Sequence, residues 1–367
     1  MTAGEGHNAC AKAALAALER ADVDCRMEDM LLLHSRIVQR VFNGAYLFML
    51  RRAPFLMKWM DSFLIGEKHP GRRKGINGFI GKLFNKPVRR LIGEYQPDAI
   101  ICTHVYGVLM LTNIRRKHGL EAPLIGINTD FALQSLWDDT EADYIVLAAE
   151  GLTHACVKRG MKEERLWVTG LPIQARFQEK VEKRTAREQL GIRDMPTILI
   201  MSGSMGYGDL PKVIKRLDSL PMEVQMLVVC GKNEKLKGQL EELSTRNPLV
   251  VYGFVDNIPL LMDGADLMLT KPGGLSTSEC LAKGLPLVMM DPIPGLEERN
   301  ALFLLAQGAG ILSTKQFPPD EAVYQLLKDP ERTEQILARQ AVLGKPAAAD
   351  ELVHRIKEVV EGMAGEG

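Results

Sequence analysis

The stretch Leu267-Met268-Leu269-Thr270-Lys271-Pro272-Gly273-Gly274-Leu275-Ser276-Thr277-Ser278-Glu279 decides the fold. It predicts a short apolar strand, a Pro-Gly-Gly turn and a helix whose first turn carries hydroxyl groups and a carboxylate. Glycines let backbone N–H groups approach a ligand closely, and a helix N-terminus offers unpaired donors with a partial positive charge. The stretch is therefore suited to hold a diphosphate without a metal, and Glu279 to accept hydrogen bonds from a sugar diol such as ribose. An ordinary strand-to-helix turn is the alternative.

Length and composition fit two α/β domains. At 367 residues the chain can form two domains, each with its own core. The 46 basic and 46 acidic residues balance, so net charge gives no argument for a nucleic-acid partner. No apolar run of about 18 residues predicts a membrane span, and the N-terminus lacks a signal-peptide pattern. The cysteines show no CxxC pair and no histidine at metal spacing, which predicts a reducing compartment and no metal site; they are Cys10, Cys25, Cys102, Cys156, Cys230 and Cys280.

The chain opens on a glycine-rich turn, Met1 to Asn8, which leads into a helix predicted over Ala9 to Arg20. Such a turn normally follows a buried strand, and in a doubly wound sheet the first strand is central. The sequence therefore predicts that the first strand of the N-terminal domain is missing, or that the true start lies upstream. His7 lies in this turn, and a neutral imidazole beside a cleft is a candidate general base. A neighbour of the helix N-cap without chemistry is the alternative.

Residues 37–66 combine apolar aromatic and basic side chains, and basic residues continue as far as Arg90. An apolar surface edged with cations is what a segment needs to lie in an anionic membrane interface. A buried helical hairpin is the alternative for most of these apolar residues. We expect a minority, within 41–66, to line an entrance for a lipid.

A first series of strands and helices fills the N-terminal half. Pro97–His104 and Pro123–Asp130 are predicted buried parallel strands that end in polar groups, Tyr144–Ala148 is a further strand, and Trp167–Pro172 closes the domain. Ligands of open α/β sheets bind outside the carboxyl ends of the strands. Asp130 is therefore a candidate to orient a base or to bind an acceptor hydroxyl, with helix capping as its alternative.

The pattern restarts after a charged helix over Lys180–Gly191. The predicted strand Thr197–Met201 is followed by a second glycine-rich loop, Ser202–Gly208, which suits a phosphate. A strand over Val250–Val255 offers backbone groups to a base edge. The loop Asp291–Asn300 places two carboxylates and an amide at a helix start, where sugar hydroxyls could bind.

Two such series predict a GT-B architecture, with two Rossmann-like doubly wound domains facing a cleft. We expect an N-terminal domain over 1–172, a C-terminal domain over 173–345, and a C-terminal helix over 346–367.

The chain resembles the monogalactosyldiacylglycerol synthase and processive diacylglycerol glucosyltransferase family, inverting GT-B enzymes related to the N-acetylglucosaminyltransferase that completes lipid II. The resemblance covers essentially the whole chain. The motifs that carry it occur in order, and several together are far more specific than one glycine loop. They are T-A-G-E-G-H-N (2–8), T-D-F (129–131) with W-D-D-T-E-A-D-Y (137–144), S-G-S-M-G-Y-G (202–208), V-V-C-G-K-N-E-K-L (228–236), T-K-P-G-G-L-S-T-S-E (270–279) and P-I-P-G-L-E-E-R-N (292–300).

The resemblance implies transfer of a hexose from a UDP-sugar to the hydroxyl of diacylglycerol, by an enzyme bound to the cytoplasmic face of the cell membrane. It implies His7 as the base, Glu279 as the ribose contact, and no cofactor or divalent ion. The remaining implied contacts are Ser204 with the N–H groups of Gly203 and Met205, and Gly273, Gly274, Ser276 and Thr277, for the diphosphate; backbone groups of Phe254 and Val255 for uracil; and Glu297 and Asn300 for the donor sugar.

Two departures from the family pattern bear on specificity. Leu296 stands where a glutamine is usual, which bears on the donor sugar, and Leu133 and Gln134 stand where many relatives carry a histidine, which bears on the acceptor. The alternatives are an N-acetylglucosamine transferase with a polyprenyl-linked acceptor, a UDP-sugar epimerase and a non-transferring binding homologue. The epimerase would not need the aromatic and basic segment. Three questions stay open: whether the donor sugar is glucose or galactose, how many sugars are added, and the oligomeric state.

Overall fold

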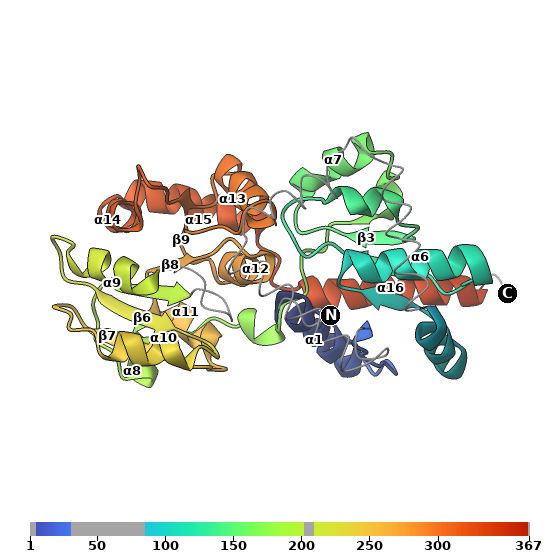
Figure 1. The fold of residues 1–367 in the computed structure, drawn as a ribbon, viewed down its shortest axis with the longest axis horizontal. Coiled ribbons are helices and arrows are strands. Elements are labelled where there is room, and N and C mark those ends of the chain that lie inside the picture. The colour runs from blue at the N-terminus through green and yellow to red at the C-terminus, as the bar shows by residue number, and fades with distance from the viewer. Residues whose placement is uncertain (1–4, 31–84, 202–208, 366–367) are drawn as a thin grey trace. The chain divides into compact units, whose positions relative to one another are not determined.

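A computed structural model describes residues 5–30, 85–201 and 209–365, and it divides into two compact units (Figure 1). Unit 1 comprises Met1–Gln174 and Ala347–Gly367, and unit 2 comprises Ala175–Pro346. The aromatic and basic segment over 37–66 lies outside the described residues, as does the loop with Gly203, Ser204 and Met205. The predictions made for both stay predictions.

Unit 1 contains a parallel four-stranded sheet in the order β1-β2-β3-β4. Its strands are shorter than predicted, because the chain turns away as soon as the polar residues begin. They are β1 (Ile100–Cys102), β2 (Leu124–Ile127), β3 (Tyr144–Val146) and β4 (Leu166–Trp167). The helices are α1 (Glu5–Arg20), α6 (Val105–His118), α7 (Thr153–Lys158), α16 (Ala348–Gly365) and a helical stretch over 85–95, with short 3-10 turns η1 (Ser135–Asp139), η2 (Glu150–Leu152) and η3 (Glu163–Arg165). Within the described residues α1 is the first element, and the strand expected before it stays a prediction.

The C-terminal helix α16 packs against α1, so both ends of the described chain belong to unit 1. Arg20 forms an ion pair with Asp350 at 2.7 Å, and Lys357 Nζ donates to the Ala21 carbonyl at 2.9 Å. Cys10 and Ala14 of α1 are buried. The C-terminal helix thus supports the helix that carries His7.

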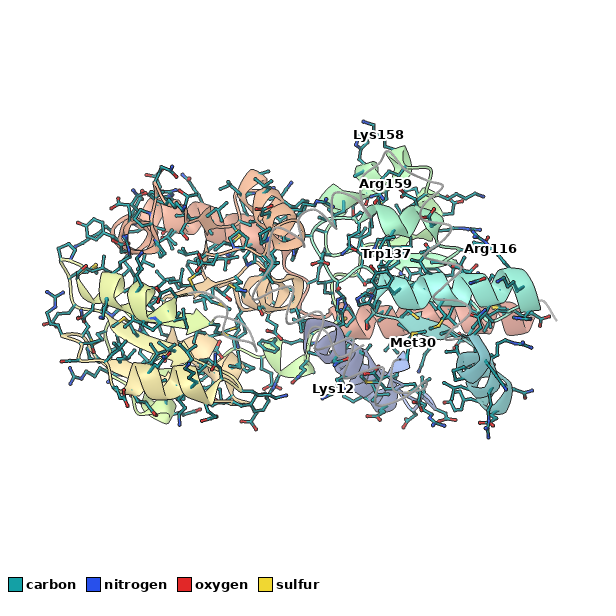
Figure 2. All side chains as sticks on the ribbon, in the orientation of Figure 1. Lys12, Met30, Arg116, Trp137, Lys158 and Arg159 are labelled. Carbon is teal, nitrogen blue, oxygen red and sulfur yellow. The ribbon has the colours of Figure 1, made fainter. Side chains whose placement is uncertain are left out.

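Trp137 packs on the sheet of unit 1 over a residue that must be glycine (Figure 2). A Cβ added to Gly126 would lie 2.5 Å from the Trp137 ring, a distance that side chains do not adopt. The indole is 3 % exposed, so it cannot move aside into solvent without opening the core. Since β2 ends one residue after Gly126, this packing fixes where the loop with Thr129 and Asp130 begins.

Unit 2 contains a parallel six-stranded sheet in the order β10-β9-β8-β5-β6-β7. Its central strands are apolar on both faces because helices cover both sides of the sheet. The strands are β5 (Thr197–Met201), β6 (Gln225–Val229), β7 (Leu249–Tyr252), β8 (Leu267–Thr270), β9 (Leu287–Met289) and β10 (Ile311–Leu312). The helices are η4 (Ala175–Phe177), α8 (Lys183–Leu190), α9 (Leu210–Asp218), α10 (Glu234–Glu241), α11 (Ile258–Gly264), α12 (Gly274–Lys283), α13 (Leu296–Ala306), α14 (Pro319–Lys328) and α15 (Pro330–Leu343).

The strand order reverses between β5 and β8. From β5 the chain moves outward to β6 and β7, then returns to place β8 on the other side of β5. This is the doubly wound order in which ligands bind outside the carboxyl ends of the two strands at the reversal. Those two strands lead into the glycine-rich loops 202–208 and Lys271–Gly274, the two stretches predicted to hold a diphosphate.

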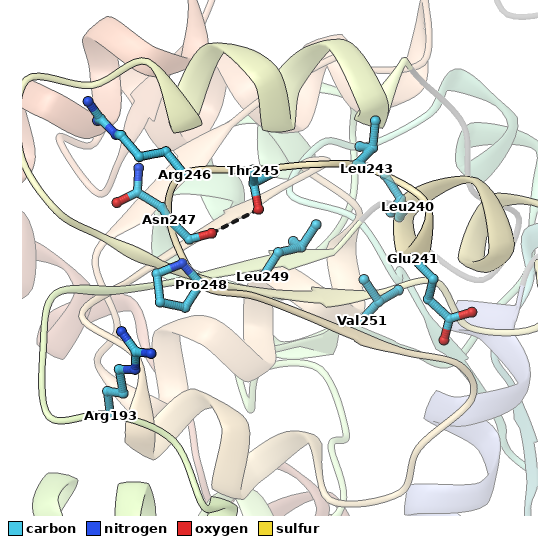
Figure 3. A pocket seen from close by; sticks show the side chains of 10 residues that line it. All are labelled: Arg193, Leu240, Glu241, Leu243, Thr245, Arg246, Asn247, Pro248, Leu249 and Val251. Carbon is cyan, nitrogen blue, oxygen red and sulfur yellow. Dashed lines mark hydrogen bonds between the residues drawn. The ribbon is translucent and has the colours of Figure 1, made fainter.

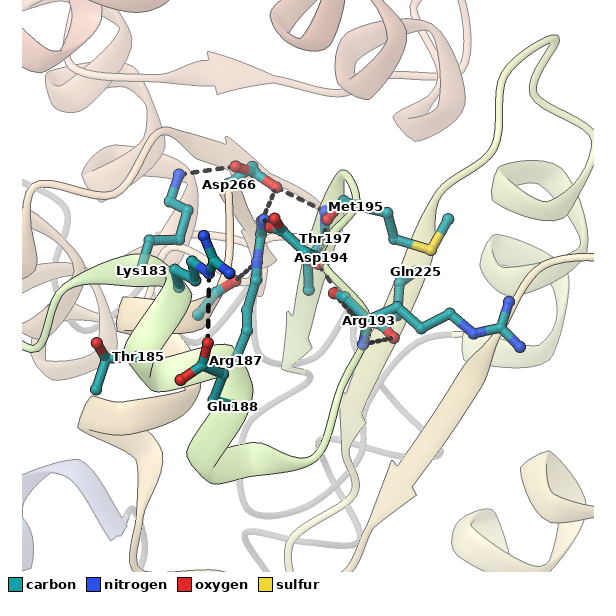
Figure 4. Close-up of polar contacts among 12 residues, drawn as sticks. Lys183, Thr185, Arg187, Glu188, Arg193, Asp194, Met195, Thr197, Gln225 and Asp266 are labelled. Carbon is teal, nitrogen blue, oxygen red and sulfur yellow. Dashed lines mark hydrogen bonds and ion pairs between the residues drawn. The ribbon is translucent and has the colours of Figure 1, made fainter.

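A polar network secures the opposite, amino ends of the same two strands (Figure 4). The Asp266 carboxylate accepts from the Thr197 backbone N–H and from Arg187, both at 2.7 Å, and from Lys183 Nζ at 2.7 Å. Arg187 is 7 % exposed and donates further to the Gly264 carbonyl and to Asp194. Asp266 therefore joins α8, the start of β5 and the start of β8.

Asp266→Ala should lower the free energy of unfolding of unit 2 by about 3 kcal/mol, because it leaves the buried Arg187 guanidinium without its main partner. Asp194→Ala is the matched control. Asp194 pairs with the same arginine, but its side chain is 71 % exposed, so its loss should cost less than about 1 kcal/mol. Urea denaturation of both variants measures the difference. Equal destabilisation by the two variants would contradict this role for Asp266.

Candidate active site

His7 lies in the first turn of α1 and is held by two loops that follow neighbouring strands. Its Nδ1 is 2.6 Å from the carbonyl oxygen of Thr103, which follows β1, and 3.0 Å from Oγ1 of Thr129, which follows β2. The ring is therefore fixed at the carboxyl ends of these parallel strands, where ligands of such sheets bind.

These contacts assign the tautomer of His7. A carbonyl oxygen only accepts hydrogen bonds, so the short contact with Thr103 requires the proton to be on Nδ1. The lone pair is then on Nε2, the form in which an imidazole takes up a proton. Desolvation by burial lowers the pKa of His7, and the Thr103 bond opposes this in part. His7 is thus neutral and able to act as a base near neutral pH.

His104 contacts His7 and begins the next helix. The two ring centroids are 4.4 Å apart, and His104 Nδ1 accepts from the Tyr106 backbone N–H at the start of α6. Burial lowers the pKa of His104 well below its ordinary value, with a further contribution from His7. A second neutral imidazole beside His7 is a feature that we did not predict. Its signal in the sequence was a histidine at the end of an apolar strand.

Asp130 is 7 % exposed and lies in the same loop as Thr129. The Asn128 amide donates to the Asp130 carbonyl at 2.8 Å, which closes this loop on itself. The described contact of this loop with His7 is made by the hydroxyl of Thr129, the residue before Asp130. A role for the Asp130 carboxylate toward the base or the acceptor stays a prediction.

In unit 2, the N-terminus of α12 presents backbone donors. Gly273 is the N-cap and no side chain caps the helix. The first intrahelical bond runs from Thr277 N–H to the Gly273 carbonyl at 3.0 Å, so the N–H groups of Gly274, Leu275 and Ser276 are left without a partner among the described residues. Unpaired N–H groups at a helix N-terminus form an anion site.

Neither the backbone conformation nor the packing at Gly273 requires a glycine. Its φ of −73° is open to any residue, and an added Cβ would meet only Glu297 Oε1, at 3.7 Å. Neither strain nor packing excludes a side chain there. Close approach of a ligand to the backbone is the requirement that remains.

The two hydroxyls predicted for the diphosphate differ in burial. Thr277 is fully buried, and its Oγ1 has no hydrogen-bond partner among the described residues. Ser276 is partly exposed in the same first turn. An unsatisfied buried hydroxyl costs free energy unless it serves a ligand, so Thr277 fits a polar group held at this helix end.

Glu297 and Asn300 belong to α13 and reach back to the Pro-Gly-Gly turn. Glu297 Oε2 accepts from the Ile293 N–H at 2.7 Å, which leaves Oε1 toward Gly273. Asn300 is fully buried and donates to the Pro272 carbonyl at 3.0 Å, so the observed amide supports the turn. Contact of either side chain with the donor sugar stays a prediction.

Lys271, between β8 and the turn, is a residue that the sequence reasoning missed. It is 7 % exposed, and burial lowers its pKa while the carboxylates of Glu297 and Asp291 oppose that shift. Burial likewise raises the pKa of Glu297, and the charge of Lys271 opposes that shift. The signal was a lone lysine at the end of an apolar strand. The turn is thus backed by a buried cation.

Glu279 lies in the second turn of α12 and is partly buried. Desolvation raises its pKa to about 8, and the charge of Arg176 opposes the shift. Without a ligand the carboxyl group is therefore protonated at neutral pH. Hydrogen bonds from a diol would favour the ionised form.

Phe254 and Val255 correct one detail of the prediction. β7 ends at Tyr252, so both residues lie in the bend that follows the strand and not in the strand itself. Their backbone groups have no hydrogen-bond partner among the described residues. The Phe254 ring is 70 % exposed, with Lys232 Nζ 5.6 Å from its centroid. Both backbones are open to a base edge.

A hollow of about 460 Å³ lies elsewhere in unit 2 (Figure 3). It is bordered by Arg193, Leu240, Arg246 and Val251, next to the edge strand β7. None of the predicted site residues lines it. Within the described ranges no group of three or more His, Cys, Asp or Glu side chains is placed to hold a metal; the absence of a metal requirement stays a prediction.

The carboxyl group of Glu279 should titrate with a midpoint near pH 8. Infrared spectra should show a protonated carboxyl band at pH 6.5 that disappears above pH 8 and is absent from Glu279→Gln. Because the folded pKa exceeds the ordinary value of 4.5, this group's contribution to stability is greatest below pH 4.5 and falls as the pH rises to 8. A midpoint near 4.5 would contradict the assignment.

Two family models match the chain in succession. The model for monogalactosyldiacylglycerol (MGDG) synthase matches residues 7–173, and the glycosyltransferase family 28 C-terminal domain matches residues 197–352. Together they span both units of the structure.

Curated relatives and solved structures agree with these matches. The processive diacylglycerol beta-glucosyltransferases of Bacillus licheniformis and Bacillus pumilus are each 34% identical, over 68% and 69% of this chain and over 65% and 66% of their own lengths. The chain thus spans slightly less than two thirds of these relatives.

Among solved structures, Acinetobacter baumannii MurG aligns with a TM-score of 0.54 at 20% identity, over 76% of this chain and 78% of its own. Anabaena HepE in complex with UDP and glucose aligns with a TM-score of 0.53 at 18% identity, over 78% of this chain and 84% of its own. These likenesses confirm the fold class, two α/β units with parallel sheets of the GT-B type. The resemblance predicted from the motifs is confirmed as well: the N-terminal part of the chain matches the monogalactosyldiacylglycerol synthase family, and the C-terminal part matches the C-terminal domain of glycosyltransferase family 28.

Proposed function

We propose that this protein is an inverting glycosyltransferase that moves a hexose from a UDP-sugar to the free hydroxyl of diacylglycerol. The observation that carries the proposal is the reversal of strand order at β5 and β8, whose following loops include the open N-terminus of α12. The two family matches and the names of the curated relatives support the same reaction. Those names also favour glucose over galactose.

The chemistry needs a base for the acceptor and stabilisation of the leaving group. Nε2 of His7 takes the proton of the lipid hydroxyl, whose oxygen attacks the anomeric carbon as the bond from that carbon to the diphosphate breaks. UDP leaves with the bonding electron pair, and the configuration at carbon inverts. The free N–H groups of Gly274, Leu275 and Ser276 stabilise the departing charge. We propose that no divalent ion is required, because these donors take the place of a metal.

The nucleotide contacts follow from the open groups of unit 2. Backbone groups of Phe254 and Val255 pair with the uracil edge, and Glu279 accepts from the ribose diol. Oε1 of Glu297 is the atom best placed for the sugar, since its Oε2 is already bound to the loop. Asn300 acts by holding the Pro272 carbonyl.

Diacylglycerol resides in a membrane, so we propose peripheral association with an anionic membrane surface on the cytoplasmic side. The segment 37–66 is the candidate contact, from its sequence alone. None of the described helices has the length and hydropathy needed to cross a bilayer.

Activity is tested by incubating the protein with diacylglycerol vesicles and, separately, UDP-glucose, UDP-galactose and UDP-N-acetylglucosamine, with and without EDTA. Mass analysis of the lipids should find hexosyl-diacylglycerol with one of the first two donors, in equal amount with EDTA. A product only from UDP-N-acetylglucosamine, or UDP binding without any glycolipid, would overturn the proposal.

His7→Ala should lower kcat about 10²- to 10⁴-fold, the usual contribution of a general base. The affinity for UDP should stay unchanged, because the nucleotide contacts lie on other residues. His154→Ala is the matched control, since His154 is an exposed histidine on α7. A His7→Ala variant with the wild-type rate would remove His7 as the base.

A further inference from the structure

We propose that Arg176 is a positioning residue of the nucleotide site, which joins the uracil loop to the helix of Glu279 and whose positive charge acts on the Glu279 carboxyl group. The inference deepens the proposed function and rests on it. It assigns a role to a residue that belongs to none of the motifs from which the resemblance was recognised.

Arg176 bonds to the uracil loop, and the turn that carries it packs on the helix of Glu279. It lies in η4, a short turn at the start of unit 2, and η4 packs against α12, the helix that carries Glu279. Its Nη1 donates to the carbonyl oxygen of Asp256, the residue directly after Val255. Arg176 therefore holds the end of the uracil loop, and the turn that carries it packs against the helix of the ribose contact.

A carbonyl acceptor leaves the charge of the guanidinium uncompensated. The Asp256 bond uses a neutral oxygen, and no ion pair of Arg176 with a carboxylate is described. The positive charge is therefore available to act on Glu279, whose own burial disfavours ionisation. An arginine keeps its charge at every pH of interest, so this influence is constant.

The charged groups on the helices around α12 that are described below have partners other than Glu279. Among the described elements, η4, α11 and α15 pack against α12. On α11 the carboxylate of Asp263 is bound to Lys283 at the far end of α12, and Arg339 on α15 is bound to Gln307. Cys280, next to Glu279, stays a protonated thiol because burial raises its pKa. Arg176 is the one cation described as acting on the Glu279 carboxyl group.

The consequence is a nucleotide affinity that depends on pH in a defined direction. The ionised carboxylate accepts both hydrogen bonds of a ribose diol, whereas the protonated group accepts less well. Affinity for UDP should therefore rise as the pH increases from 6 to about 8, and then level off. Loss of Arg176 should move that rise to higher pH.

The test is calorimetric titration of UDP into the full chain from pH 6 to pH 9.5. Arg176→Gln should bind UDP about tenfold more weakly at pH 7 for each unit by which the Glu279 pKa rises, and should recover above pH 9. Arg176→Lys, which keeps the charge, should retain the wild-type pH profile. Arg184→Gln is the control, because Arg184 is an exposed arginine on α8 paired with Glu188. It should match the wild type.

A second comparison separates the electrostatic role from mere support of the loop. In a Glu279→Gln background this carboxyl group is absent, so adding Arg176→Gln should cause no further change in the pH profile. Wild-type affinity and pH midpoint in Arg176→Gln would overturn the inference, as would a uniform loss at all pH values. A wild-type protein that does not bind UDP would instead refute the proposed function.

Discussion

Pairing of β5 with β8 is the constraint on which the rest of unit 2 depends. These strands are separated by some 70 residues of chain, yet they pair in parallel register from Ile198 with Leu267 to Met201 with Thr270. Asp266 secures their amino ends through Thr197 N–H and Arg187. Because the register is fixed there, the carboxyl ends of the two strands finish together. A charge network and a nucleotide site thus occupy opposite ends of one strand pair.

Burial sets the protonation of the groups with proposed roles. Desolvation lowers the pKa of His7 and raises that of Glu279, so both are neutral at pH 7 before substrates bind. For His7 the neutral form is the active one, and the Thr103 carbonyl directs its lone pair to Nε2. For Glu279 the neutral form is the resting one, and hydrogen bonds from a ligand would favour its ionisation. We propose that Arg176 reduces the free energy needed to ionise the carboxyl group. Desolvation therefore favours the active form of His7 and disfavours the ionised form of Glu279.

The sequence predicted the fold class because a strand, a glycine turn and a helix recur in order, and this pattern is local. It also indicated His7, Gly273 and Glu279, whose neighbours form recognisable motifs. It could not indicate the Thr103 carbonyl, because every residue has one, nor Asp266, whose partner Arg187 lies 79 residues away. Nor could it indicate that the Asn300 amide holds the Pro272 carbonyl. Long-range partners decide such roles, and a single sequence does not contain them.

The central claim is that the first turn of α12 holds the diphosphate of the donor. A crystal structure of the protein grown with UDP, without divalent ions, tests it most directly. The account predicts β-phosphate oxygens within hydrogen-bond distance of the N–H groups of Gly274 and Leu275, and the ribose diol on Glu279. UDP bound with its diphosphate away from α12, for instance in the hollow beside Arg193 and Arg246, would contradict it.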